Sequence, residues 1–264
     1  MDFHRAKYIL PNLFTLSSMG AGLYSIQLSA TAQTVSDISL AAWLLVVSMI
    51  CDLLDGRVAR MTRTETELGI QLDSMSDAIS FGVAPAFLLF HWGMVEWGML
   101  GQLAAFGYAA CAILRLARFN VLANKDVKTK RYFLGLPTPL AAGTVVAMVM
   151  AHVAYTGSMT LAGSEGLVAI LSLLLGGLMV SNIRYRTFKD LDLSGKTTVV
   201  ASIVVGLSVA VSVMLKPSVT FVLLMLAYIV LGLGGGILNL GRTLLGQEES
   251  GEEPALVEAY ESDG

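Results

Sequence analysis

Long apolar runs alternate with short polar joins over most of the chain. Each run has about 20 residues, the length that an α-helix needs to cross a bilayer core of roughly 30 Å. The pattern therefore predicts an all-α, polytopic membrane protein with about eight transmembrane helices. The predicted spans are residues 8–29, 38–60, 69–91, 97–119, 137–157, 165–184, 197–215 and 219–241.

The end of the chain has a different pattern. Residues 247–264 read QEESGEEPALVEAYESDG, which is acidic and has few large apolar side chains. A stretch of this kind cannot bury enough apolar surface to offset the entropy of ordering it. We expect one transmembrane domain over residues 1–246, followed by a disordered tail over residues 247–264.

Composition and charge support this division and predict how the chain is oriented in the membrane. Of the 264 residues, 55% are hydrophobic and only 14% are charged, whereas soluble domains are about a quarter charged. All 17 Lys and Arg residues except Lys216 lie before the first span, after the eighth span, or near alternate joins between spans. By the positive-inside rule, both termini and the join between the second and third spans face the cytoplasm. We expect a multi-pass protein of the cell membrane whose surroundings are membrane lipids, with no nucleic-acid partner.

Four acidic residues interrupt this apolar pattern. Asp52, Asp55, Asp73 and Asp77 lie in or beside the second and third spans. A carboxylate within the bilayer costs roughly 2.5–3.5 kcal/mol even on lenient insertion scales, so four of them require a compensating partner. Carboxylate oxygens are hard ligands that favour Mg²⁺ or Mn²⁺, and four carboxylates can hold two such ions.

The spacing of these residues places them on facing helix stripes. Asp52 and Asp55 recur at helical spacing with Gly56, Ala59 and Arg63, and Gly69, Asp73 and Asp77 form a four-residue stripe on the next helix. Two antiparallel helices joined by a short cytoplasmic turn bring the stripes together. Paired metals suit phosphoryl chemistry, and Arg60 can add a charge-assisted contact to a phosphate. The alternatives are solvated helix-end acids, or a path for divalent cations through a transporter.

The full pattern resembles the signature of the CDP-alcohol phosphotransferase family. The stretch DLLDGRVAR, followed by Gly69, Asp73 and Asp77, matches every fixed position of that signature. The resemblance implies the fold of this family, a catalytic domain at residues 1–246 with its core at residues 52–77, and a homodimer. It also implies transfer of a substituted phosphoryl group from a CDP-linked donor to an alcohol, with release of CMP.

The resemblance assigns roles residue by residue. Asp52, Asp55, Asp73 and Asp77 are the implied metal ligands, and Asp77 is also the implied proton acceptor for the attacking hydroxyl. The implied contacts with the CDP-linked donor are Asn12, Thr15, Asp52, Gly56, Ala59, Arg60, Thr66 and Gly69. For Asn12 and Thr15, a helix start marked by Pro11 is an equally good explanation.

Three further stretches resemble the phosphatidylserine synthase branch of this family: YILPNLFTLSSMGAG, ILRLARFNV and FLGLPTP. The branch implies CDP-diacylglycerol as donor and L-serine as acceptor. Glycerol 3-phosphate, inositol and choline remain alternative acceptors. Arg63, Arg115 and Arg118 are candidates to bind the acceptor or a phosphate, and for Arg115 and Arg118 the alternative is a membrane anchor that reaches the headgroups.

Overall fold

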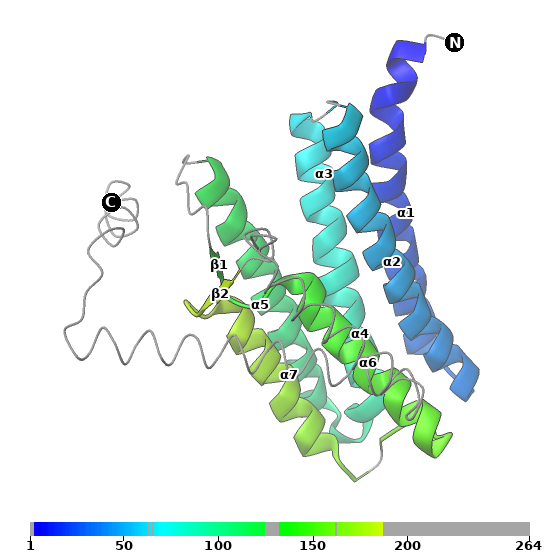
Figure 1. The fold of residues 1–264 in the computed structure, drawn as a ribbon. Helices are drawn as coiled ribbons and strands as arrows, with labels where there is room; N and C mark the ends of the chain where they lie inside the picture. The colour runs from blue at the N-terminus through cyan, green and yellow to red at the C-terminus, as the bar shows by residue number, and fades with distance from the viewer. Residues whose placement is uncertain (1–2, 63, 65, 125–131, 162, 187–264) are drawn as a thin grey trace, which may run out of the picture.

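The computed structural model describes residues 3–62, 64, 66–124, 132–161 and 163–186. This part of the chain is a bundle of helices with one pair of short strands (Figure 1). The elements, in chain order, are α1 (Phe3–Thr31), α2 (Val35–Thr62), α3 (Glu67–Asp77), the π-helix η1 (Ala78–Val83), α4 (Ala84–Gly93), the 3₁₀ turn η2 (Val95–Trp97), α5 (Met99–Asn124), β1 (Tyr132–Leu134), α6 (Thr138–Thr156), α7 (Glu165–Val180) and β2 (Arg184–Arg186).

The first six predicted spans coincide with helices in the described part of the chain, and the chain is a membrane protein. Four helical segments are long and apolar enough to cross a bilayer, and α7 is a shorter apolar helix. Many large apolar side chains point outward, such as Phe106 with 69% of its surface exposed, as suits a surface in contact with lipid. The predicted spans at residues 197–215 and 219–241, the tail and Arg63 lie outside the described residues.

The third predicted span, residues 69–91, lies within one helical segment, Glu67–Gly93, and this segment contains a π-turn that the sequence did not indicate. A π-turn, η1, separates α3 from α4. Pro85 has no N–H to offer the carbonyl of Phe81, four residues earlier, and the buried Tyr108 hydroxyl donates to that carbonyl over 3.3 Å. The interruption therefore begins directly after Asp77, and π-turns of this kind are frequent at functional sites.

Hydroxyl groups and glycines allow α1 to lie very close to its neighbours. Ser18 and Ser48 share a hydrogen bond of 2.8 Å between their hydroxyls across α1 and α2. Ser80 donates to the Ser18 carbonyl over 3.1 Å, and a Cβ on Gly22 would lie only 2.8 Å from the Ser80 hydroxyl. Small residues that let helix backbones approach closely are typical of membrane interfaces. Figure 1 shows α1, α2 and α3 side by side as a result.

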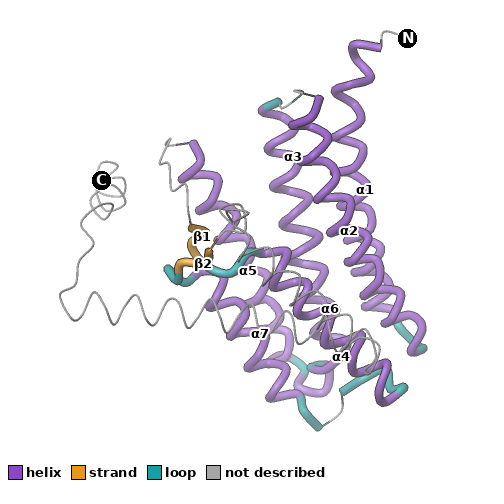
Figure 2. The backbone as a smooth tube through the Cα atoms, viewed as in Figure 1, coloured by secondary structure: helices purple, strands orange, loops and turns teal. Residues whose placement is uncertain are grey.

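The strand pair joins the ends of α6 and α7 beside α5 (Figure 2). β1 and β2 are antiparallel, with Phe133 opposite Tyr185. Between β1 and α6, Gly135 has a φ of +75°, and a Cβ there would lie 2.2 Å from the Met179 carbonyl oxygen. Only glycine fits at this position, which explains the glycine in the FLGLPTP stretch. The turn places Thr138 at the first position of α6, against α5.

Candidate metal and phosphoryl-transfer site

The four aspartates converge between α2 and α3, as the facing stripes predict. Asp52, Asp55 and Asp73 each offer a carboxylate oxygen, and these three oxygens all lie within 4.8 Å of one another. Asp77 completes the group, because its carboxyl lies within hydrogen-bonding reach of Asp52 and interacts electrostatically with Asp73 and Asp55. The join between α2 and α3 runs only from Thr62 to Glu67, and this short turn keeps the two stripes opposed.

The group has the properties of a metal site. Asp55 is only 5% exposed, and Oδ1 of Asp77 is buried with no hydrogen-bond partner among the residues that the structure describes. A buried acceptor without a partner is costly, and several carboxylates in one low-dielectric place repel each other. A divalent cation relieves both costs, and an all-oxygen donor set fits a hard ion. The cluster can therefore bind a metal ion.

Thr15 connects α1 to this cluster. Its hydroxyl donates to Oδ2 of Asp55 over 2.8 Å, and its second contact is with the Pro11 carbonyl at 3.2 Å. Its backbone carbonyl accepts from the Ser76 hydroxyl at 3.0 Å, so one residue of α1 contacts both α2 and α3. α1 begins at Phe3, well before Pro11. The explanation of Asn12 and Thr15 as a helix start is therefore wrong.

Asn12, Thr66 and Gly69 lie together at the N-terminal end of α3. The Thr66 hydroxyl accepts from the Gly69 N–H at 3.0 Å and caps the helix. A Cβ on Gly69 would lie 3.1 Å from that hydroxyl and 3.5 Å from Oδ1 of Asn12. Three residues from two distant stretches, all expected at the donor site, are thus brought close to one another.

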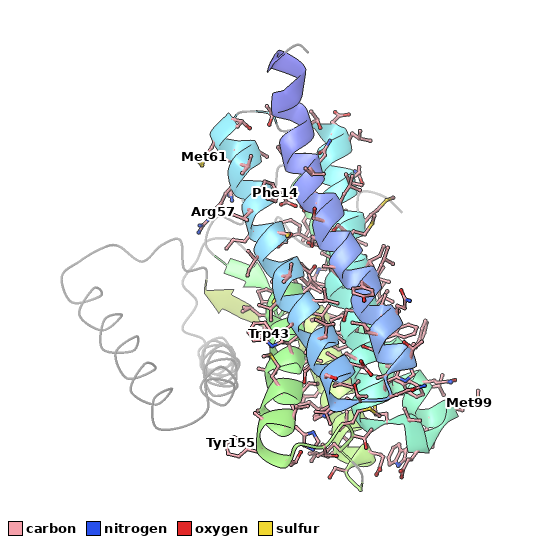
Figure 3. The ribbon with its side chains drawn as sticks, turned by 90° about the vertical axis from the view of Figure 1, so that its right-hand side faces the viewer. Phe14, Trp43, Arg57, Met61, Met99 and Tyr155 are labelled. Atoms are coloured by element: carbon pink, nitrogen blue, oxygen red, sulfur yellow. The ribbon has the colours of Figure 1, made fainter. Side chains whose placement is uncertain are left out.

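Gly56, Ala59 and Arg60 lie on the last turns of α2. Nε of Arg60 donates to the Gly56 carbonyl over 2.8 Å, so the exposed guanidinium lies back along the helix. The Ala59 carbonyl accepts from the Thr64 N–H at 3.1 Å, where the helix ends. Figure 3 shows Arg57 and Met61 projecting outward from this end of α2, away from α1.

Arg115 and Arg118 lie on α5 and contact α6 and the end of α7. Arg115 donates to the Thr138 hydroxyl over 2.7 Å, and Thr138 is fully buried. Arg118 lies 3.4 Å from the Val180 carbonyl, and its Nε is buried with no hydrogen-bond partner among the described residues. The Arg115 contact is half-buried, whereas the Arg118 contact is exposed. Neither contact was evident from sequence, since both depend on how α5, α6 and α7 pack.

Sequence reasoning missed Asn120 and Ser74. The Asn120 side-chain amide, on α5, donates to the Ser74 hydroxyl, on α3, over 2.9 Å. Asn120 belongs to the ILRLARFNV stretch, from which only the two arginines were selected as candidates. The signal for Asn120 in the sequence was a polar side chain near the end of a predicted span, two residues after Arg118. Its partner could not be named without the packing of the helices.

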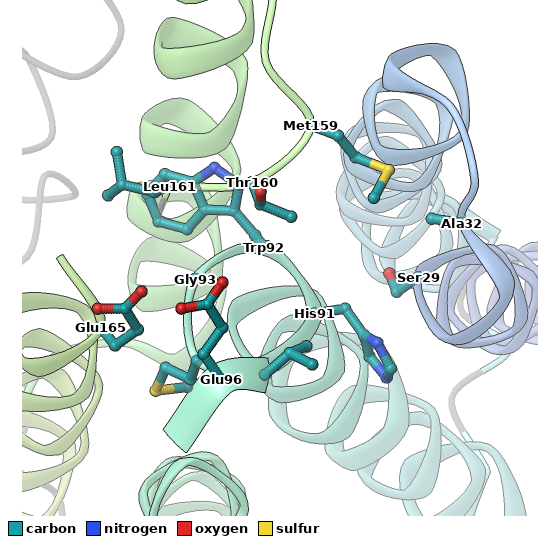
Figure 4. Close-up of a pocket in the computed structure, with 12 residues that line it drawn as sticks. Ser29, Ala32, His91, Trp92, Gly93, Glu96, Met159, Thr160, Leu161 and Glu165 are labelled. Atoms are coloured by element: carbon teal, nitrogen blue, oxygen red, sulfur yellow. The ribbon is translucent and has the colours of Figure 1, made fainter. Parts of the chain in front are cut away.

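A separate hollow of about 260 Å³ lies at the other end of the bundle, where α1 and α4 end. Figure 4 shows Glu96 and Glu165 on one side of it and Ser29 and His91 on the other. None of the four aspartates, all of which are described, lines this hollow. It is therefore distinct from the carboxylate cluster.

Comparisons with known proteins agree on one family. Residues 8–178 match the family model described as CDP-alcohol phosphatidyltransferase. A CDP-diacylglycerol–serine O-phosphatidyltransferase of Helicobacter pylori is 38% identical over 200 residues, which cover 76% of this chain and 81% of that protein. A protein of the same name from Methanocaldococcus jannaschii is 40% identical over 147 residues, covering 56% of this chain and 64% of its own. An archaetidylserine synthase of Methanothermobacter thermautotrophicus is 35% identical over 178 residues, covering 67% and 69%.

Proposed function

Because the chain belongs to the CDP-alcohol phosphatidyltransferase family, we propose that it transfers the phosphatidyl group of CDP-diacylglycerol to the hydroxyl of L-serine. The products are phosphatidylserine and CMP. The observation that carries the proposal is the convergence of Asp52, Asp55 and Asp73 within 4.8 Å, with Asp77 beside them. Serine is favoured over other alcohols because the names of the three relatives all specify it.

Asp77 is the proposed general base. A serine hydroxyl ionises too weakly to attack at neutral pH, so a positioned carboxylate must accept its proton. Asp77 has a buried carboxylate oxygen with no other described partner, which leaves that oxygen available for the substrate. As the proton moves to Asp77, the serine oxygen bonds to the phosphorus that carries diacylglycerol. The bond from this phosphorus to the bridging oxygen breaks, and CMP leaves with that electron pair.

Asp52, Asp55, Asp73 and Asp77 are the proposed ligands of Mg²⁺ or Mn²⁺, with two ions as the expected number. Bound metal would neutralise charge on the transferring and leaving groups. Thr15 holds the Asp55 carboxylate in place through its hydrogen bond of 2.8 Å. We assign the donor to the end of α2 and the start of α3, with Asn12, Thr15, Asp52, Gly56, Ala59, Arg60, Thr66 and Gly69 as its proposed contacts. The support is that Asn12 lies beside Thr66 and Gly69, and that Arg60 contacts Gly56.

Arg115 and Arg118 are the proposed acceptor-binding residues. A carboxylate such as that of serine pairs well with a guanidinium group, which donates two hydrogen bonds in a fixed geometry. The half-buried contact between Arg115 and Thr138 supports a role for Arg115 inside the protein rather than at the headgroups. Arg63 remains a candidate for the same role and lies outside the described residues.

The proposed setting is the cell membrane, with both termini and the aspartate cluster on the cytoplasmic side and two chains forming a homodimer. The support for the orientation is the distribution of Lys and Arg between alternate joins. A cysteine placed at Thr62 in a chain without Cys51 and Cys111 should react with an impermeant thiol reagent only in opened cells. Reaction in intact cells would reverse the orientation, and chemical cross-linking in membranes would test the dimer.

An alcohol panel tests the reaction. Membranes containing the protein are supplied with CDP-diacylglycerol, Mg²⁺ or Mn²⁺ and one alcohol at a time, and CMP release is measured. We expect CMP only with serine. Release with glycerol 3-phosphate, inositol or choline instead would keep the family chemistry and change the acceptor. Metal flux into protein-containing liposomes without CDP-diacylglycerol, with no CMP from any alcohol, would favour a transporter.

The base is tested by Asp77→Asn, which keeps the size of the side chain and removes its capacity to accept a proton. We expect turnover to fall by at least 10²-fold, the lower range for general-base catalysis, while donor binding persists. Asp37→Asn is the matched control, because Asp37 accepts from the Gln33 and Thr34 N–H groups at the far end of α2. Near-normal turnover by Asp77→Asn would refute the assignment of Asp77 as the base.

A further inference from the structure

One hydrogen bond links the helix of the proposed base to the helix of the proposed acceptor arginines. The Asn120 amide donates to the Ser74 hydroxyl over 2.9 Å, and the Ser74 hydroxyl donates to the Ile70 carbonyl over 3.1 Å. Both side chains are half-buried. Ser74 directly follows Asp73 and precedes Asp77 by less than one helical turn. A movement of α3 at Ser74 would therefore move both carboxylates.

The α5 helix has two faces with different contacts. On one face, Ala109 and Ala112 pack against Gly82 of η1, and a Cβ on Gly82 would lie 3.3 Å from Cβ of Ala112. Asn120 continues this face two turns further along. On the other face, Arg115 and Arg118 reach α6 and the end of α7. Asn120 therefore adds a direct hydrogen bond between the arginine-bearing helix and α3.

The α3 helix is held from the opposite direction by α1. The Ser76 hydroxyl donates to the Thr15 carbonyl over 3.0 Å, and Thr15 itself contacts Asp55. Ser76 and Ser74 are two residues apart and so lie on different sides of α3. The Ser76 bond holds α3 against α1, and the Ser74 bond holds α3 against α5.

We propose that Asn120 is a positioning residue that, through Ser74, sets the distance between Asp77 and the acceptor-binding face of α5. The proposal rests on the proposed function, since it needs the acceptor to bind on α5. Without this bond, metal and donor bind to an unchanged cluster, but the acceptor hydroxyl is misplaced. A misplacement of about 1 Å can lower the rate about 10²-fold. The expected signature is a lower kcat with unchanged metal dependence.

A double-mutant cycle tests the proposal. We expect Asn120→Ala and Ser74→Ala each to lower kcat by about 10- to 100-fold, with the KM for CDP-diacylglycerol and the half-saturating Mn²⁺ concentration within about twofold. The double variant should be no slower than the slower single variant, because both changes remove the same bond. Ser74→Thr keeps the hydroxyl and should restore most of kcat. Gln102→Ala, an exposed amide of α5, is the matched control and should stay at the wild-type rate.

Several results would overturn the proposal. If Ser74→Ala keeps full activity while Asn120→Ala loses it, Asn120 acts on the substrate directly. If the effects of the two changes multiply, or if the Mn²⁺ dependence shifts, the bond does not act by positioning α5. Should Asn120→Ala fail to fold, as judged by thermal unfolding in detergent, the comparison of Ser74→Ala with Ser74→Thr tests the same bond.

The cycle separates this inference from the proposed function. The alcohol panel on the wild-type protein decides the acceptor before any variant is made. The cycle is then run with whichever alcohol releases CMP. If the wild-type protein is inactive with serine, the proposed acceptor is refuted. If the wild-type protein is active but the effects of Asn120→Ala and Ser74→Ala on kcat multiply in the double variant, only the role of Asn120 is refuted.

Discussion

Replacing Thr15 with valine tests how α1 contributes to the metal site. The two side chains have nearly the same shape, but valine cannot donate to Asp55. The bond that is lost is 2.8 Å long, is made to a carboxylate, and joins two residues that are 4% and 5% exposed. A hydrogen bond to a charged group contributes about 1.5–3 kcal/mol, and about 1.4 kcal/mol corresponds to a factor of ten.

The expected result is therefore a rise of about 10- to 100-fold in the Mn²⁺ concentration that gives half-maximal CMP release. Asp55 would remain in place but would no longer be held in one orientation, which weakens its binding to the ion. The KM for CDP-diacylglycerol, measured at saturating Mn²⁺, should change less than the Mn²⁺ dependence. The measurement is CMP release over a titration of Mn²⁺, with purified protein in mixed micelles of detergent and lipid.

Thr31→Val is the matched control for this experiment. Thr31 lies on the same helix, and its hydroxyl donates to the Gln27 carbonyl four residues earlier at 2.9 Å, as the Thr15 hydroxyl does to Pro11. Its hydroxyl has no carboxylate partner among the described residues, so its Mn²⁺ titration should match that of the wild type. A higher KM for CDP-diacylglycerol with an unchanged Mn²⁺ titration in Thr15→Val would refute the reasoning. That outcome would limit the Thr15 hydroxyl to its proposed contact with the donor.

Two further changes test the fold around the site. Gly135→Ala should destabilise the protein by more than about 1 kcal/mol, because φ at this position is +75° and the new Cβ would clash with the Met179 carbonyl. A lower thermal unfolding midpoint checks this, and an unchanged midpoint would contradict it. Tyr108→Phe should cost about 1 kcal/mol, because it leaves the buried Phe81 carbonyl without the Tyr108 hydroxyl. Denaturation in detergent measures that loss, and equal stability would show that the hydroxyl is not needed at the π-turn.

The carboxylate cluster was predictable from sequence because its geometry is local. Asp52 and Asp55 are three residues apart, Asp73 and Asp77 are four apart, and a short turn joins their helices. Helical periodicity and an antiparallel turn were enough to bring them together. The cost of carboxylates in an apolar span then indicated a metal. The structure confirms that three of the carboxylate oxygens meet within 4.8 Å.

The π-turn was not predictable in the same way. Residues 69–91 form one continuous apolar run around Asp73 and Asp77, so hydropathy indicates one helix. The proline at position 85 is a weak signal, since membrane helices often contain proline. The Tyr108 hydroxyl on α5 donates to the Phe81 carbonyl, which Pro85 leaves without a backbone N–H. A partner 27 residues away in sequence cannot be identified from hydropathy.

The contacts that organise the site share one physical cause. In lipid there is little hydrophobic drive for helices to associate, so close packing and hydrogen bonds between helices must supply specificity. Thr15 reaches Asp55, Ser76 reaches the Thr15 carbonyl, and Asn120 reaches Ser74. The first two bonds join the cluster to α1, and the third joins it to α5. The short polar side chains near the aspartates therefore indicate which helices pack around this site.

This reasoning also explains why α1 is needed although it supplies none of the four carboxylates. If α2 and α3 alone held the cluster, mutual repulsion of the carboxylates would drive the two helices apart whenever no metal was bound. The Ser18–Ser48 bond holds α2 against α1, and the Ser80 and Ser76 bonds hold η1 and α3 against the same helix. α1 thus keeps the carboxylates close before metal arrives. The cost of bringing like charges together is met by folding, so metal binding does not have to supply it.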